Sequence, residues 1–136
     1  MSADMATIIN YVQAMMRDLD GVLEAPDEAP EQMVQFPFIV AFPRSGEISR
    51  ESVQAMGLHT MYIEVHIGRQ VLPSAIRMAL PFGKSVPDAL WADPKLGGNV
   101  STIRAIRYTF GRLDWGQEQH VGWRFELDFK TMTNID

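Results

Sequence analysis

The feature that most constrains the fold is a strict alternation near the end of the chain. Apolar side chains occupy every second position from Val121 to Phe129, and Gly, Arg, Glu and Asp fill the positions between them. Successive side chains of a strand point to opposite faces of a sheet, so this run predicts a strand with one buried face and one wet face. Such a strand is typical of an antiparallel sheet that is covered on one side only.

Shorter patterns predict three further strands. Residues 36–42 place three phenylalanines on one face, and the prolines within and after this run suit an edge of the sheet, because proline donates no ladder hydrogen bond. Residues 58–67 alternate again. The polar stretch 44–57 between these two strands is expected to be a connection much longer than a hairpin needs. A last hairpin begins near Ile103, and a parity shift near Ala105 indicates a bulge.

Helical periodicity is confined to two regions. Apolar residues recur at steps of three and four over 8–23, which predicts an amphipathic helix, followed by an exposed or mobile proline-bearing loop at 24–33. A second helix is expected over 72–80, and a third from the capping residue Ser85 to a point before Pro94. The sequence thus predicts one α+β domain spanning residues 1–136, with helices packed on one face of a four-stranded antiparallel sheet built from two hairpins.

Composition excludes several classes of site. The chain has no cysteine, which removes disulfides, thiolate metal sites and cysteine nucleophiles. The 12 basic and 17 acidic residues give a net charge of −5, but six acids and no base fall within 18–31, so the other residues carry 12 minus 11, or +1. With no basic stripe, tight nucleic-acid binding is not expected. No apolar run approaches the roughly 18 residues of a membrane helix.

One group of polar residues leaves two alternatives open. Glu64 and His66 share a face of their strand, as do Glu126 and Asp128 of the last strand. If the two faces coincide, the cluster could bind a divalent metal or carry out acid–base catalysis. The favoured interpretation is a solvated sheet face with cross-strand pairs, such as Glu64 opposite Arg124.

The most specific motif lies in residues 89–100. A helix containing Leu90 leads into the turn Asp-Pro-Lys-Leu-Gly-Gly, on which Leu96 is expected to be exposed, and two strands follow. This turn and the order of elements resemble the tail terminator proteins of long-tailed bacteriophages, also called tail-completion or minor tail proteins. The resemblance covers nearly the whole chain in layout and about a dozen residues in motif. The matching turn residues are Asp93, Pro94, Leu96, Gly97 and Gly98.

The resemblance implies a structural virion protein of the tail and neck, made in the host cytoplasm, with no catalysis, cofactor or metal. It implies a homo-hexameric ring that caps the tail tube, stops tube growth and joins the tail to a head–tail connector or stopper protein. DNA would pass through the lumen without specific binding, and no membrane is involved. Three alternatives stay open: another ring protein of the neck or tube, a small metal-dependent enzyme using the polar sheet face, and a soluble binding module with no virion role.

Two sets of residues are candidates for the contacts of such a ring. Head-to-tail assembly needs two different patches on each subunit. The long polar connection and the tryptophans near turns are expected to meet the next subunit or the tube, through Arg44, Glu47, Arg50, Glu51, Trp91 and Trp115. Acidic side chains are expected to face the lumen, where like charge lets DNA slide; these are Asp18, Asp20, Glu24, Asp27, Glu28 and Glu31.

Overall fold

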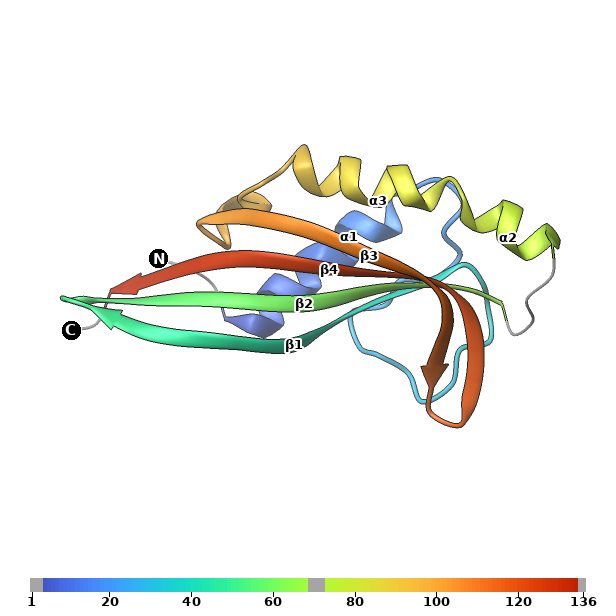
Figure 1. Cartoon of the computed structure of the whole chain (residues 1–136), viewed down its shortest axis with the longest axis horizontal. Helices are drawn as coiled ribbons and strands as arrows, with labels where there is room; N and C mark the ends of the chain where they lie inside the picture. The colour runs from blue at the N-terminus through green and yellow to red at the C-terminus, as the bar shows by residue number, and fades with distance from the viewer. Residues whose placement is uncertain (1–3, 69–72, 135–136) are drawn as a thin grey trace.

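The fold is α+β, with one four-stranded antiparallel sheet of strand order β1-β2-β4-β3 (Figure 1). The computed structural model describes residues 4–68 and 73–134. The elements follow in the order α1 (Met5–Arg17), β1 (Phe38–Glu51), β2 (Gln54–Gly68), α2 (Pro73–Ala79), α3 (Phe82–Trp91), the 3₁₀ turn η1 (Leu96–Gly98), β3 (Thr102–Trp115) and β4 (Glu118–Asn134). The predicted architecture of two hairpins with helices on one face is therefore confirmed.

The main core lies between the helices and one face of the sheet. Ile8, Val12 and Met16 form the buried stripe of α1, as their spacing predicts, and pack with strand residues that include Ile63 and Phe125. The expected continuation of this helix to residue 23 is wrong. The helix ends at Arg17, Gly21 adopts a φ of +86°, and Leu23 is 63% exposed, because the chain turns there towards the start of β1.

The first hairpin is far longer than the sequence indicates. β1 runs on to Glu51 and β2 begins at Gln54, so the expected loop 44–57 is wrong and the stretch is a paired ladder closed by residues 52–53. Its one irregularity is a bulge between Pro43 and Ser45. The end of β4 pairs with β2 here as well, so this arm (residues 44–57 with the end of β4) is three-stranded. The arm projects beyond the helices (Figure 1).

The helical region also departs from expectation. α3 begins at Phe82, with Pro81 in the N-cap position, so the predicted start at Ser85 is wrong. Phe82, Val86 and Leu90 are buried four residues apart along one face, and this packing onto the sheet fixes the helix start in preference to a cap. Of the residues predicted for the preceding helix, Leu72 lies outside the described residues, and α2 covers the others as far as Ala79.

The second face of the sheet is partly covered. Segment 24–36 includes the residues 24–33 that were expected to be exposed or mobile. Ala25 and Met33 are buried, so that expectation is wrong at these two positions, while residues 27–29, 31 and 32 are exposed as expected. Met33 forms a small second core with Phe38 and Val40 of β1, and Trp115 of β3 packs against it. The β3–β4 hairpin curves at this end of the molecule (Figure 1), which brings Trp115 onto the second face.

Candidate functional site

The turn motif, residues 93–98, connects α3 to β3 and is hydrogen-bonded to α1. One carboxylate oxygen of Asp93 accepts the N–H of Gly97 at 3.0 Å, and the other accepts the hydroxyl of Tyr11 in α1. That hydrogen bond to Asp93 raises the pKa of Tyr11. The N–H of Ile103 donates to the Pro94 carbonyl at 2.8 Å, which fixes the start of β3. Leu96 is fully buried, so its expected exposure is wrong, and the turn holds the fold together.

The candidate contact residues of β1 lie on the arm. Arg44 and Glu47 are exposed, and the Arg44 guanidinium lies 5.5 Å from the centre of the Tyr62 ring. Arg50 donates to the Ser52 carbonyl at 3.0 Å, and Glu51 is the last residue of the strand. Two apolar side chains near the tip, Ile48 and Val53, are 73% and 62% exposed. The arm therefore presents both charge and apolar surface without a core of its own.

The two candidate tryptophans differ in their surroundings. Trp91, the last residue of α3, is 48% exposed. Trp115 packs within its own chain, where its indole N–H donates to the Pro30 carbonyl at 2.8 Å and its ring centre lies 5.8 Å from that of His66. Trp91 is exposed, and its contact with a partner stays a prediction, whereas Trp115 holds segment 24–36 against the sheet.

The candidate acidic residues follow the path from the end of α1 to β1. Most are exposed, and Asp27 accepts a hydrogen bond from Arg17 at 2.9 Å. Glu24 is half-buried and its backbone forms an isolated parallel bridge with Phe38. No described contact places these acids beside one another in a cluster, so their position relative to a lumen stays a prediction.

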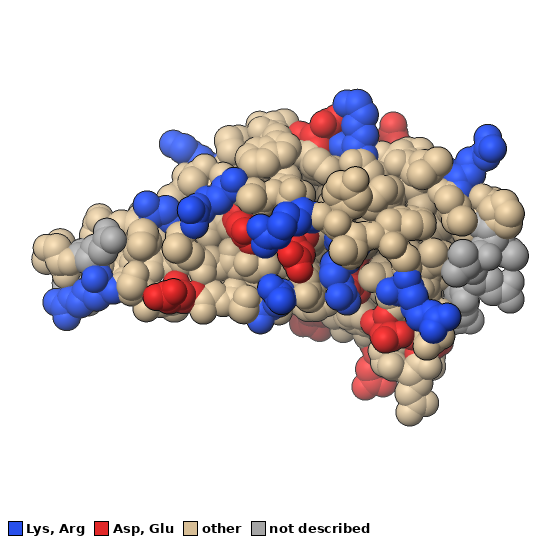
Figure 2. Space-filling model, viewed as in Figure 1, with Lys and Arg blue, Asp and Glu red and all other residues tan. Residues whose placement is uncertain are grey.

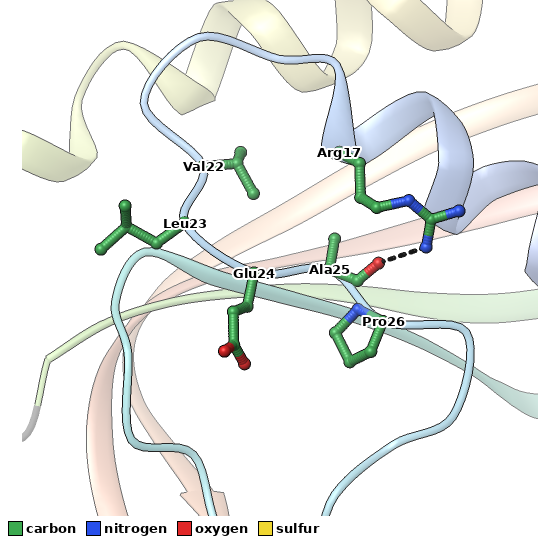
Figure 3. Close-up of a pocket in the computed structure, with 6 residues that line it drawn as sticks. All are labelled: Arg17, Val22, Leu23, Glu24, Ala25 and Pro26. Carbon is green, nitrogen blue, oxygen red and sulfur yellow. Dashed lines mark hydrogen bonds between the residues drawn. The ribbon is translucent and has the colours of Figure 1, made fainter.

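A cavity of about 420 Å³ lies next to this path (Figure 3). It is lined by Arg17, Val22, Leu23, Glu24, Ala25 and Pro26. Arg17 donates to the Ala25 carbonyl at 2.8 Å, while the Glu24 carboxylate points away from the guanidinium. Its two ionisable side chains do not converge on a common point, which an acid–base site would need.

The polar residues of β2 and β4 do share one sheet face, and arginines engage them. Glu64 pairs with Arg124 as predicted, accepting from the guanidinium Nε at 2.7 Å and Nη2 at 2.6 Å. Glu126 and Asp128 accept instead from Arg107 of β3, at 3.1 and 2.7 Å. Basic and acidic side chains are accordingly interspersed over the visible surface (Figure 2). In the described part of the chain, no group of three or more His, Asp or Glu could hold a metal.

A buried polar chain at the end of this face was not foreseen. Glu64 Oε1 lies 2.9 Å from His66 Nε2, His66 Nδ1 lies 2.8 Å from His120 Nδ1, and His120 Nε2 lies 3.0 Å from Glu118 Oε2. Both imidazoles and Glu64 are buried, whereas the Glu118 side chain is 27% exposed. The spacing Glu-x-His occurs in both strands, at 64–66 and 118–120, and this repeated spacing is the signal that could have revealed the chain.

These features define an α+β domain with an extended arm, a hydrogen-bonded turn and a buried polar chain. Comparison with known protein families and with curated proteins finds no match to this chain. Among the described residues, no helix has the length and apolar character needed to cross a membrane.

Proposed function

We propose that the protein is a structural virion component that forms a hexameric ring on the phage tail tube. The ring ends tube growth and joins the tail to the head–neck connector, and DNA passes through its lumen past the acids of 18–31. The resemblance of the Asp93–Gly98 turn and of the element order supports this proposal. The observation that carries it is the arm, because a ladder that projects beyond the core has no packing use within a single subunit.

The two ends of the molecule present different apolar surfaces. The arm tip exposes Ile48 and Val53. At the other end, exposed Leu23 and Met78 border an apolar hollow of about 520 Å³ between α2, the start of α3 and the beginning of β1. A head-to-tail contact uses two unlike patches and closes into a ring when the rotation allows. The arm tip of one copy would therefore lie in the hollow of the next.

The ring is tested by light scattering after size exclusion and by electron microscopy, with and without purified tail tubes. We expect hexameric rings that cap one end of each tube. The double substitution Ile48→Ser with Val53→Ser should leave the unfolding temperature unchanged and abolish capping. The matched control, Ile48→Val with Val53→Ile, keeps the apolar tip and should cap normally. Capping by the serine variant would contradict the role of the arm, and binding along the whole tube would identify a tube protein instead.

The proposed contact has a direct test, because the chain contains no cysteine. Cysteines introduced at Val53 and Met78 should form a disulfide between neighbouring copies in the assembled ring. Oxidation should then give a ladder of covalent oligomers up to six copies, and each single variant should give none. Rings that assemble normally but never cross-link would place the arm on a different surface of the neighbour.

A further inference from the structure

Strand β3 forms one edge of the sheet, and its outer side is open. The strand order β1-β2-β4-β3 places β4 on its inner side, and no other described strand pairs with it. At its start the N–H of Ile103 donates to the Pro94 carbonyl. Beyond that point no backbone hydrogen bond joins β3 to a described residue outside the sheet. An edge of this kind carries a row of backbone N–H and C=O groups that can pair with another chain.

The two edges of the sheet differ in how they are protected against such pairing. Natural edges are commonly interrupted by proline, by a bulge or by a covering segment. β1 contains Pro43 with a bulge next to it, and a bridge from Glu24 covers its start at Phe38. β3 contains no proline, and its register with β4 runs without a shift from Ala105 to Trp115. The β3 edge therefore keeps a long, regular row of backbone groups open.

Two aromatic rings stand at this edge, on the side of the sheet that the helices cover. Tyr108 and Phe110, two residues apart, are 65% and 39% exposed. Both lie edge-on to Trp123 of β4, with ring centres 5.4 and 4.9 Å away. Trp123 is itself held in place, because its indole N–H donates to the Ala79 carbonyl at 2.7 Å and a Cβ on Gly83 would lie 2.9 Å from its ring. Rings held in this way lose little freedom on binding, which suits the anchors of an interface.

The charge of β3 is basic. The strand contains three arginines and one acid, Asp114, so it carries 3 minus 1, or +2. Arg107 is engaged by carboxylates of β4. Arg112 is exposed, follows the two aromatic rings on the same face by the two-residue period, and forms no ion pair with a described residue. An acidic side chain of a partner would complement it, whereas pairing of this edge with a second β3 would bring like charges together.

We propose that the outer edge of β3 binds an extended segment of another protein, which adds a strand to the sheet. In this mode of recognition the backbone hydrogen bonds supply affinity and alternate side chains supply specificity. The segment carries apolar side chains beside Tyr108 and Phe110 and an acidic side chain beside Arg112. The inference goes beyond the proposed ring, because it concerns a surface that the contact between arm tip and hollow does not use.

The probe is a short, capped peptide of alternating valine and glutamate. Its binding is measured by fluorescence polarisation of a labelled copy and by amide hydrogen exchange of the unaltered protein. We expect binding that weakens with added salt, and slower exchange at alternate amides of residues 105–114, which are those that point away from β4. The same peptide with every backbone nitrogen methylated keeps the side chains but cannot donate, so it should not bind.

Variants of the protein separate the aromatic from the charged contribution. The double substitution Tyr108→Ser with Phe110→Ser should weaken binding at least about tenfold, since aromatic anchors are typical hot spots. Arg112→Gln should weaken binding by up to about fivefold and reduce its dependence on salt. Leu80→Ser is the matched control: it removes an exposed apolar side chain from another surface, and it should bind the peptide as the wild type does.

The outcomes that overturn the proposal are distinct. Failure of the valine–glutamate peptide to bind would overturn it, as would binding that leaves the outer amides of β3 unprotected or equal binding of the methylated peptide. Equal binding of a valine–lysine peptide would remove the acidic partner. Self-association that is lost in the double serine variant would also overturn it, because a second copy would then occupy the edge. Failure to cap tail tubes, with peptide binding intact, would contradict the ring alone.

Discussion

Replacing Gly97 by alanine tests whether Tyr11 of α1 packs closely against the Asp93–Gly98 turn. Gly97 has a φ of +67°, and a Cβ placed there would lie 2.5 Å from Cε2 and 2.8 Å from the hydroxyl oxygen of Tyr11. Alanine at this position must adopt a left-handed conformation and also displace the ring. The displaced ring would lose the hydrogen bond that its hydroxyl donates to Asp93.

The size of the effect follows from these two terms. A left-handed conformation is unfavourable by about 1–2 kcal/mol for a residue with a Cβ. Loss of a hydrogen bond to a charged group removes about 1.5–3 kcal/mol. Since Tyr11 is only half-buried, the lower part of that range applies. We expect Gly97→Ala to lower the free energy of unfolding by about 2.5–4 kcal/mol, measured by urea denaturation with tryptophan fluorescence.

The neighbouring glycine provides the control. Gly98 has a φ of +89°, and a Cβ there would meet nothing within 4 Å. Gly98→Ala should therefore lose only the backbone term, about 1–2 kcal/mol. In a Tyr11→Ala background, Gly97→Ala should lose no more than Gly98→Ala does. Equal losses for the two glycine variants in the wild-type background would refute the close packing of Tyr11 on the turn.

Two further predictions concern burial and charge. Leu96→Ala should lower the free energy of unfolding by about 3 kcal/mol in urea denaturation, since this side chain is fully buried. Leu80→Ala, at an exposed position, should change it by less than about 0.5 kcal/mol. A loss for Leu96→Ala as small as that for Leu80→Ala would place Leu96 at the surface. Burial opposes ionisation of Asp128, but hydrogen bonds from Arg107 and Thr60 outweigh it and lower the pKa of that carboxyl. The Asp128–Arg107 pair therefore stabilises the fold above about pH 4, and this stability is lost as the pH falls. Arg107→Ala should then lower stability slightly at pH 7 and leave it unchanged near pH 2, because an exposed ion pair is screened by solvent; an equal loss at both pH values would contradict the pairing.

The sequence predicts the fold best where one face of an element is buried. The alternation of β4, the buried stripe of α1 and the bulge between Ile103 and Ala105 all appear in the structure as expected. The pairing of Glu64 with Arg124 was also predictable, because the two strands place opposite charges on one face. In each case the order of apolar and polar side chains along the element indicates which of its faces is buried.

The arm and segment 24–36 were missed for a related reason. Backbone ladders also form between polar side chains, and residues 44–57 carry no alternation of apolar and polar residues that would predict a strand. Segment 24–36 is acidic and proline-bearing, yet it buries Ala25 and Met33 and accepts hydrogen bonds from Arg17 and Trp115. The arm and segment 24–36 are both held by contacts with residues far away in the sequence, and a local sequence pattern does not predict such contacts.

The hydrogen-bond partners of the polar sheet face bear on the proposed assembly. An active site typically gathers polar groups in a hollow and leaves them available to a substrate. Here the carboxylates of Glu64, Glu126 and Asp128 are engaged by arginines of the same sheet. The large apolar side chains at the two ends, Ile48 and Met78 among them, are exposed. Contiguous exposed apolar patches typically mark contacts with other proteins, so the two apolar ends are where the proposed assembly is best tested.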